Sequence, residues 1–389
     1  MYVLLNSAIK ILSFTYWFFK LLPSSKKVTF ISRQSNEPSL DISMLSGKIT
    51  ELHPEYECVI LCRKIEGGIM SKLRYCFHML RQMYHLATSE VIVLDSYSIL
   101  VSILDHKKNL LVIQMWHSVG TMKKFGYSIL DMPEGSSSKL AHIMKMHRGY
   151  DYILAASEAY KPHLADGFNY PIEKIITMPL PRVEALKDKS RASQTRQKIL
   201  EKYPQLGVKK NILYVPTFRK EEPEKFKSAA ASLADAVDYE NYNLIIKVHP
   251  LAELDLTHEH AIIDNYFSSF DMLFIADYVI SDYSCIIYEA AIRKLPLYLY
   301  TYDYEHYMNT RDIYMDYKKE MPGPVCNTAA DTVQAIKKDI CRPKDVEKFL
   351  NKYVYSGSKH ETQDIVDFIF SNKKCNDKHQ NRCINSFYL

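Results

Sequence analysis

The chain has 389 residues, of which 47% are hydrophobic and 24% are charged, and this ordinary globular composition excludes a disordered or fibrous protein. Its length predicts about two domains. The 50 basic and 45 acidic residues give a formal net charge of +5, which requires no nucleic-acid partner but suits a phosphate-rich substrate or an anionic membrane.

The first 27 residues are mostly apolar and aromatic. Four lysines interrupt or follow the apolar run Met1–Leu22: Lys10, Lys20, Lys26 and Lys27. A membrane-spanning helix requires about 20 mostly apolar residues, and this run reaches that length only with two charges inside it. We therefore predict an amphipathic helix that lies in the membrane interface, with a true span and a helix packed on the protein as the alternatives.

Short apolar runs then alternate with helical patterns along the chain. The runs lack a polar alternation, as strands buried on both faces do, so this order of elements predicts an α/β fold with parallel sheets. We predict one set of strands at Val28–Ile31, Cys58–Leu61, Val91–Leu94, Leu110–Gln114 and Tyr152–Ala155, and a second set at Ile175–Met178, Ile212–Val215, Leu244–Val248, Tyr278–Ser281 and Leu297–Tyr300.

The two sets of strands predict two Rossmann-like domains, at residues 28–170 and 171–370, followed by a polar tail at 371–389. The join is expected near Pro162–Arg182, where prolines cluster. A ligand is expected in the cleft between the domains, at the carboxyl ends of the strands. A helix predicted over Ile69–Ser89 carries basic residues, and it presents either a second membrane-facing surface or a solvated face.

The segment Gln114–Gly120 carries the first chemical signal, because a predicted strand ends there. His117 follows this strand end, and a histidine that titrates near neutral pH can take a proton from a hydroxyl. Lys123, slightly further along the chain, suits a phosphate. A structural histidine held by the backbone is the alternative.

Two further strand ends carry groups that suit a phosphorylated nucleotide. Arginine offers paired donors to a phosphate, and threonine offers a hydroxyl. Because side chains alternate along a strand, a lysine and a histidine two positions apart lie on the same face. The groups are Pro216, Thr217 and Arg219 after one strand, and Lys247 and His249 after the other. A surface turn is the alternative for each strand end.

The fourth segment runs from a short strand into a helix. Ser281 and Asp282 end the strand, Ser284 is an expected N-cap, and Glu289 lies within the helix. A helix N-terminus with free N–H groups binds anions, and a carboxylate accepts hydrogen bonds from ribose or alditol hydroxyls. Together with the other segments, these residues predict a site for a nucleotide-diphosphate donor without a metal cage.

In order and spacing, these segments resemble the CDP-glycerol glycerophosphotransferase family, which includes the teichoic acid primases, glycerol-phosphate polymerases and ribitol-phosphate transferases of Gram-positive bacteria. The resemblance covers residues 110–317. It rests on Trp116-His117 with Gly120, Lys123 and Gly126, on Tyr214–Arg219, on Lys247–Pro250, on Ile280–Ser284 with Glu289, and on Pro296–Asp303 with Tyr307 and Arg311.

The resemblance implies a GT-B-like fold, with an acceptor domain at residues 28–170 and a CDP-alditol-binding domain at residues 171–370. It also implies a peripheral enzyme at the cytoplasmic face of the membrane that uses no cofactor. It implies transfer of glycerol phosphate from CDP-glycerol to a polyprenyl-diphosphate-linked saccharide or to the growing polymer, with release of CMP. The implied partners are this acceptor and the inner leaflet of the membrane, without nucleic acid, and homo-oligomerisation stays open.

Three alternatives remain beside this expectation. The first is a ribitol-phosphate transferase that uses CDP-ribitol. The second is a GT-B glycosyltransferase that builds a capsule or cell wall. The third is a membrane-anchored protein that binds polymer precursors without chemistry.

The family's functional residues carry over by position. His117 is the implied general base, and His249 is the second implied catalytic residue, which holds the donor pyrophosphate together with Lys247. The implied substrate-binding residues are Trp116, Ser118, Gly120, Lys123, Arg182, Pro216, Thr217, Arg219, Lys247, Ser281, Asp282, Ser284 and Glu289.

Several positions depart from the family pattern. The family has Gly, Thr, Ser, Asp and Gly, respectively, where this chain has Ser118, Ser281, Cys285, Glu289 and Pro179. These changes are chemically mild, so the reaction class is expected to hold while the identity of the alditol stays open.

Overall fold

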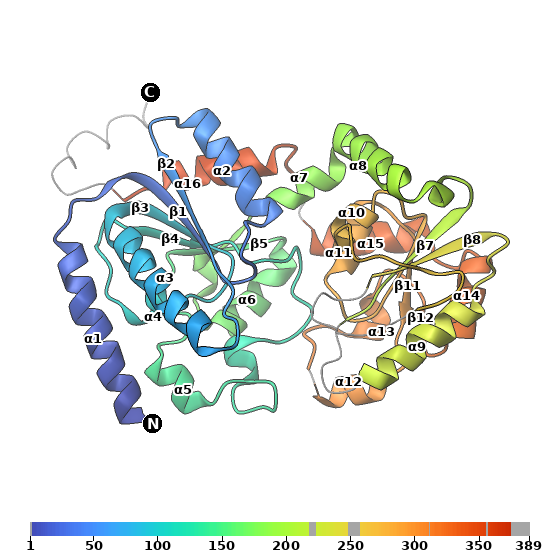
Figure 1. Ribbon diagram of the computed structural model, residues 1–389, viewed down its shortest axis with the longest axis horizontal. Coiled ribbons are helices and arrows are strands. Elements are labelled where there is room, and N and C mark those ends of the chain that lie inside the picture. The colour runs from blue at the N-terminus through green and yellow to red at the C-terminus, as the bar shows by residue number, and fades with distance from the viewer. Residues whose placement is uncertain (1, 218–222, 248–256, 311, 355–356, 375–389) are drawn as a thin grey trace.

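The computed structural model describes residues 2–217, 223–247, 257–310, 312–354 and 357–374. Two six-stranded parallel sheets with flanking helices form two halves of the molecule (Figure 1). The strand order is β2-β1-β3-β4-β5-β6 in the first sheet and β12-β11-β10-β7-β8-β9 in the second. The two parallel-sheet α/β domains expected from the sequence are therefore confirmed.

The first half begins with a long helix and then alternates strands with helices. Its elements are α1 (Tyr2–Lys20), β1 (Ser25–Ser32), α2 (Leu40–Leu52), β2 (Glu57–Cys62), α3 (Ile69–Thr88), β3 (Ser89–Leu94), α4 (Ile99–Ile103), β4 (Leu111–Gln114), α5 (Ser138–Ile143), β5 (Tyr152–Ala155), α6 (Lys161–Phe168), β6 (Ile175–Thr177) and α7 (Pro181–Lys187).

The second half repeats this alternation. Its elements are α8 (Lys189–Lys202), β7 (Lys210–Val215), α9 (Pro223–Ala236), β8 (Tyr242–Ile246), β9 (Ile262–Ile263), α10 (Ser269–Met272), β10 (Tyr278–Ser281), α11 (Ile286–Ile292), β11 (Leu297–Tyr300), α12 (Tyr304–Thr310), α13 (Tyr317–Glu320), β12 (Val325–Cys326), α14 (Ala329–Lys337) and α15 (Pro343–Tyr353), and α16 (Glu361–Ser371) ends the described fold.

Burial explains why the strands were recognisable in the sequence. The strands β4 and β11 are buried along their whole length, so neither face selects polar residues. Each predicted strand position is occupied by a strand, although the last residue predicted for β8, Val248, lies outside the described residues. The two-residue strands β9 and β12 were not predicted, because such short runs show no periodic pattern.

The strand at Ile175–Met178 was predicted in the second set, and this was wrong. It forms β6, which pairs in parallel with β5 through Ile153 and Ile175 and is the edge strand of the first sheet. The chain therefore passes to the second half only after β6, beyond the boundary expected at residue 170. The reason is that the Pro-rich stretch before β6 forms α6 and a turn within the first half rather than a linker.

The last helix returns to the first half. Ile365, Val366 and Ile369 of α16 pack in one buried cluster with Ile42 and Leu45 of α2 (Figure 1). The sequence had placed this helix in the second domain, because its pattern shows only that one face is apolar and not which sheet that face covers.

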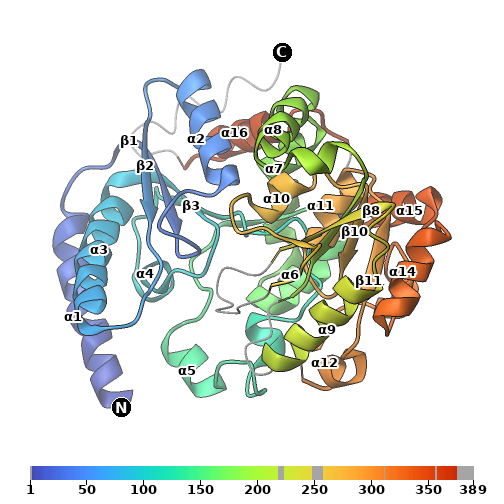
Figure 2. The same ribbon diagram turned by 45° about the vertical axis from the view of Figure 1, so that its right-hand side comes forward.

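The helix predicted near the N-terminus is α1, which lies beside α3 (Figure 2). Tyr16 is the buried contact, its hydroxyl 2.9 Å from Nδ1 of His106. Among the described residues, α1 is the one helix long and apolar enough to cross a membrane, and little of its surface is buried. Large apolar side chains are exposed on both helices, including Phe14 and Trp17 on α1 and Phe77 on α3.

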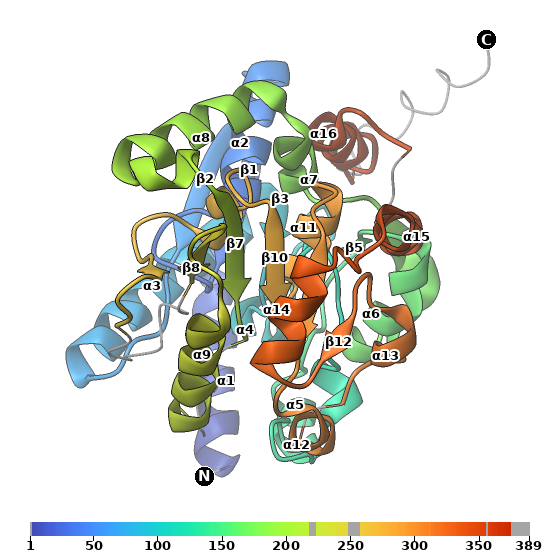
Figure 3. The same ribbon diagram turned by 90° about the vertical axis from the view of Figure 1, so that its right-hand side faces the viewer.

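The carboxyl ends of parallel strands gather at one edge of a sheet, where ligands bind in such folds. In the second half, the arrowheads of β7 and β10 point toward α12 (Figure 3). The two halves also contact each other through their backbones. Lys123 and Ile313 form an antiparallel bridge, and the Tyr314 N–H donates to the Met122 carbonyl over 3.0 Å.

Candidate active site

His117 lies just beyond the end of β4, as predicted. Its Nδ1 is 3.1 Å from the backbone carbonyl of Asp95, which follows β3. Because a carbonyl only accepts, Nδ1 carries the proton and Nε2 keeps its lone pair. Burial lowers the pKa of His117, the hydrogen bond to Asp95 opposes this, and Arg182 lowers the pKa further. The imidazole is therefore neutral near pH 7 and able to accept a proton.

Trp116 fixes the turn that presents His117. Its φ of 68° lies in the left-handed region, which is unfavourable for a bulky residue. The side chain of Gln114 compensates, because its Oε1 accepts from the Trp116 N–H over 2.9 Å. The indole packs against the rings of His117, Phe125 and Phe168, with centroid distances of 4.2, 4.7 and 5.1 Å. This aromatic packing holds the strained turn in place.

The loop after His117 contacts the second half at the start of α11. A Cβ at Gly120 would lie 2.5 Å from the ring of Tyr288, so only glycine fits there without a shift. Ser118 Oγ donates to the Gly120 carbonyl over 2.8 Å, and Cys285 Sγ donates to the same oxygen over 3.4 Å. The ammonium of Lys123 lowers the pKa of Cys285, which burial raises more strongly. Lys123 thus brings positive charge close to the start of α11.

Arg182 joins the two halves through buried carboxylates. Its Nε donates to Oδ2 of Asp41 in α2 over 2.7 Å, and its Nη1 donates to Oε1 of Glu289 in α11 over 2.8 Å. Burial opposes the charged guanidinium, but the two carboxylates outweigh it and raise the pKa of Arg182. Burial raises the pKa of Glu289, and Arg182 partly lowers it. Arg182 and Glu289, both predicted to contact the donor, are therefore paired with each other.

Lys247, expected to hold the donor pyrophosphate, is buried beyond the end of β8. Its ammonium donates over 2.8 Å to Oδ2 of Asp264 and over 2.8 Å to the Asp264 carbonyl, and it also donates to the Phe267 carbonyl. These contacts use all three donors of the ammonium, so Lys247 braces the turn after β9. Arg219 and His249 lie outside the described residues, and their roles stay predictions.

The predicted residues at the ends of β7 and β10 lie together. Ser281 Oγ donates to the Val215 carbonyl over 2.7 Å, and the Thr217 N–H donates to Oδ1 of Asp282 over 2.8 Å. Pro216, Ser281 and Asp282 are buried. The polar side chains after β10 therefore fix the backbone after β7, and contact of these residues with a donor stays a prediction.

Ser284 was expected to be the N-cap of the following helix, and the structure bears this out only in part. The helix α11 begins at Ile286, with Cys285 at the N-cap position and no side-chain cap. Ser284 lies one residue earlier, where its Oγ accepts from the Ile286 N–H over 3.4 Å. Cys285 already has helical backbone angles, so helical geometry begins directly after Ser284, close to where the sequence indicated.

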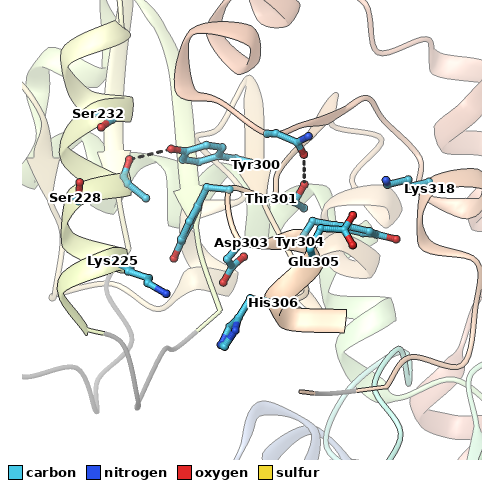
Figure 4. Close-up of a pocket in the computed structure, with 13 residues that line it drawn as sticks. Lys225, Ser228, Ser232, Tyr300, Thr301, Asp303, Tyr304, Glu305, His306 and Lys318 are labelled. Carbon is cyan, nitrogen blue, oxygen red and sulfur yellow. Dashed lines mark hydrogen bonds between the residues drawn. The ribbon is translucent and has the colours of Figure 1, made fainter. Parts of the chain in front are cut away.

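A pocket of about 610 Å³ opens at the carboxyl end of β11, between α9 and α12 (Figure 4). Tyr300 donates to the Ala229 carbonyl in its wall, and Lys225 and Lys318 reach it from opposite sides (Figure 4). Ammonium groups, phenols and hydroxyls of this kind suit an anionic polyol. None of the catalytic or substrate-binding residues assigned from the sequence lines this pocket, but Tyr300–Asp303, the end of the family segment Pro296–Asp303, does.

Sequence reasoning missed the carboxylates that organise the site. Asp41 and Asp264 hold Arg182 and Lys247, but no motif spacing connects the members of either pair. Asp95 could have been proposed as a site residue from the sequence, because it directly follows a predicted strand. Within the described ranges, no group of three or more His, Cys, Asp and Glu side chains is arranged to hold a metal ion.

The chain is similar to known proteins along most of its length. The sequence model of the CDP-glycerol:poly(glycerophosphate) glycerophosphotransferases matches residues 13–371. The chain belongs to this family. The match extends the resemblance seen in residues 110–317 over nearly the whole chain.

Two relatives indicate the range of lengths in the family. The chain is 30% identical to the teichoic acid ribitol-phosphate primase of Bacillus spizizenii, over 90% of this chain and 92% of that protein. It is 27% identical to the teichoic acid poly(ribitol-phosphate) polymerase of the same species, over 92% of this chain but only 58% of the polymerase. The chain therefore matches a primase over nearly its full length and the polymerase over little more than half.

Among solved structures, the wall teichoic acid polymerase TagF is similar over 95% of both chains, with a TM-score of 0.73 and 19% sequence identity. At this identity the similarity shows the fold alone. Together with the two parallel sheets, it confirms the predicted GT-B-like architecture of the family.

Proposed function

We propose that the chain transfers the alditol phosphate of a CDP-alditol to a membrane-linked acceptor in teichoic acid synthesis, and that CMP is released. Family membership supports this reaction, and His117 is the observation that carries it. Among the described residues, nothing hydrogen-bonds to its Nε2, while Asp95 fixes the proton on Nδ1. A neutral base is thus held at the sheet edge where such folds bind ligands.

In the proposed reaction, Nε2 of His117 takes the proton of an acceptor hydroxyl. The hydroxyl oxygen attacks the β-phosphorus that carries the alditol, and the bond from this phosphorus to the oxygen shared with the α-phosphate breaks. CMP leaves with that oxygen. Lys123 offsets negative charge from beside α11, and we assign the same part to Arg219 and His249.

We infer that ribitol is the alditol, because the two sequence relatives described above are ribitol-phosphate enzymes. Glycerol, expected from the sequence motifs, is the second candidate and is favoured by the family's own description.

A donor screen tests the reaction and the alditol together. The purified full-length chain is incubated with a short-chain polyprenyl-diphosphate-linked saccharide and, in parallel, with CDP-ribitol, CDP-glycerol and UDP-sugars. We expect CMP release with a CDP-alditol, and the product mass identifies the unit and the number added. Release of UDP would support the glycosyltransferase instead, and acceptor binding without turnover of any donor would support the binding protein.

His117→Gln tests the base. We expect kcat to fall by about 100-fold or more, because general base catalysis contributes factors of this size, while the Kd of the donor stays unchanged. The matched control is His142→Gln, which changes an exposed histidine on α5 of the same half. A His117→Gln enzyme with near-normal kcat would show that another group removes the proton.

We also propose that α1 and α3 rest on the inner leaflet, at the cytoplasmic face of the membrane. The exposed apolar side chains of both helices support this, as does the basic charge of Lys10, Lys72 and Arg74 on the same elements. A lipid-linked acceptor would then meet the first half of the molecule where that half contacts the bilayer.

A further inference from the structure

Asp95 is a buried carboxylate without a hydrogen-bond partner at the edge of the first sheet. It follows β3, and only 2% of its surface is exposed. Neither Oδ1 nor Oδ2 accepts a hydrogen bond from any described residue. The hydroxyls of Ser32 and Ser96 lie close enough to affect its charge, but neither completes a hydrogen bond with the carboxylate.

Such a group is unfavourable for folding. A buried carboxylate that loses its water and gains no donor disfavours the charged form strongly. Burial accordingly raises the pKa of Asp95 to about 6, with Asp41 adding to the shift and Ser32, Ser96 and Arg182 opposing it. Buried polar groups of this kind are rare, and they concentrate where function requires them.

The surroundings of Asp95 are those of the proposed base. Its own carbonyl accepts from Nδ1 of His117, which follows the adjacent strand β4. Asp41 from α2 and Arg182 from α7 act on the pKa of both residues. On the other side, at the end of β2, Asp95 raises the pKa of Cys62, although burial of that thiol is the larger cause. Within the described ranges, Asp41 and Arg182 are the charged groups that shift the pKa of Asp95.

We propose that Asp95 belongs to the acceptor site, where its carboxylate accepts a hydrogen bond from a hydroxyl adjacent to the one that His117 deprotonates. This inference rests on the proposed function and specifies the substrate class at this edge. A carboxylate repels a pyrophosphate but binds hydroxyl donors well. The occupant is therefore a polyol rather than the donor diphosphate, and we assign it to the acceptor because Asp95 lies beside the base that takes the acceptor's proton.

The substitution Asp95→Asn keeps the shape and removes the charge. With the full-length enzyme at pH 8, we expect the acceptor KM to rise about tenfold or more, because a hydrogen bond to a charged group is lost, while the donor KM stays the same. Direct titration with the short-chain polyprenyl-diphosphate-linked saccharide, without donor, should show the same loss of affinity. Because this titration contains no donor, it measures the effect of Asp95 on acceptor binding independently of the transfer reaction.

The same variant should be more stable than the wild type. The raised pKa of Asp95 means that its protonated form favours the fold, so wild-type stability decreases as pH rises through about 6. Asparagine removes this loss, and the melting temperature at pH 8 should increase. Weaker acceptor binding in a more stable protein distinguishes a binding role from a structural one. The matched control, Glu361→Gln, changes a buried carboxylate at the start of α16, and it should leave the acceptor KM unchanged.

The pH dependence tests the wild type without any substitution. Acceptor affinity should fall as pH decreases through about 6, and Asp95→Asn should show the weaker affinity at every pH. An unchanged acceptor KM in Asp95→Asn, or a rise in the donor KM instead, would overturn the assignment while leaving the proposed function intact. Failure of the wild type to use any CDP-alditol would contradict the proposed function. In that case the titration with the acceptor alone would still show whether Asp95 contributes to acceptor binding.

Discussion

Arg182 shows that the chemistry of a residue does not by itself predict which groups that residue contacts. The family resemblance implies that Arg182 contacts the donor, because its position matches that of a family arginine. The structure pairs it with Asp41 and Glu289, which lie 141 positions before and 107 positions after it. No local pattern reports partners at such distances. Lys247 is a second example, because its partner Asp264 could not be predicted from the sequence either. The position of His117 could be predicted, because it directly follows a predicted strand and so lies at the edge of the sheet.

Arg182→Ala should therefore act on stability. It leaves two buried carboxylates without their cation, and breaking such a network costs about 3–5 kcal/mol in the free energy of unfolding. Urea denaturation measures the change. The control is Lys319→Ala, which removes an exposed ion pair with Asp316 and should cost less than about 1 kcal/mol. If Arg182→Ala is no less stable than this control but has a raised donor KM, the guanidinium contacts the donor, as the sequence predicted.

Elements were easier to predict than their assignment to sheets. Fully apolar runs identified the long strands, because burial on both faces removes any polar alternation. The same runs do not say which sheet a strand joins, and β6 was therefore misplaced. The sequence also located the start of a helix only approximately. Ser284 resembles an N-cap, while α11 starts two residues later.

The loop from Trp116 to Gly126 couples the base to the second half, and Gly120→Ala tests this coupling. A methyl group at Gly120 meets the ring of the buried Tyr288, so loop and helix must separate. We expect a loss of about 1–3 kcal/mol in stability, as for other overpacked sites, together with a lower kcat. The control is Gly47→Ala on the exposed face of α2, where nothing lies within 4 Å of the new Cβ and alanine favours the helix. An equal response of the two variants would mean that the loop does not depend on this contact.

At the scale of the whole molecule, the apolar surface of α1 and α3 predicts membrane binding. Replacing Phe14, Trp17 and Phe77 with serine removes exposed side chains and should leave the fold intact. We expect binding to vesicles that contain anionic lipid to weaken strongly, because buried apolar area drives interfacial binding. Cosedimentation measures this. Tyr266→Ser removes an equally exposed ring on the second half and should bind as the wild type does. Unchanged binding by the triple variant would place the membrane contact elsewhere.

The return of α16 to α2 has a consequence for movement. The second sheet is, in topological terms, an insertion into the first half, entered after β6 and left before α16. Because the chain crosses between the halves twice, we expect it to oppose twisting of one half against the other more than a single linker would, and to leave hinge-like opening and closing as the easier motion. Since the first half carries α1, α3 and α16, a copy of the protein resting on a bilayer would hold that half still. The second half, which we expect to bind the donor, would then swing toward and away from a lipid-linked acceptor fixed in the plane below it.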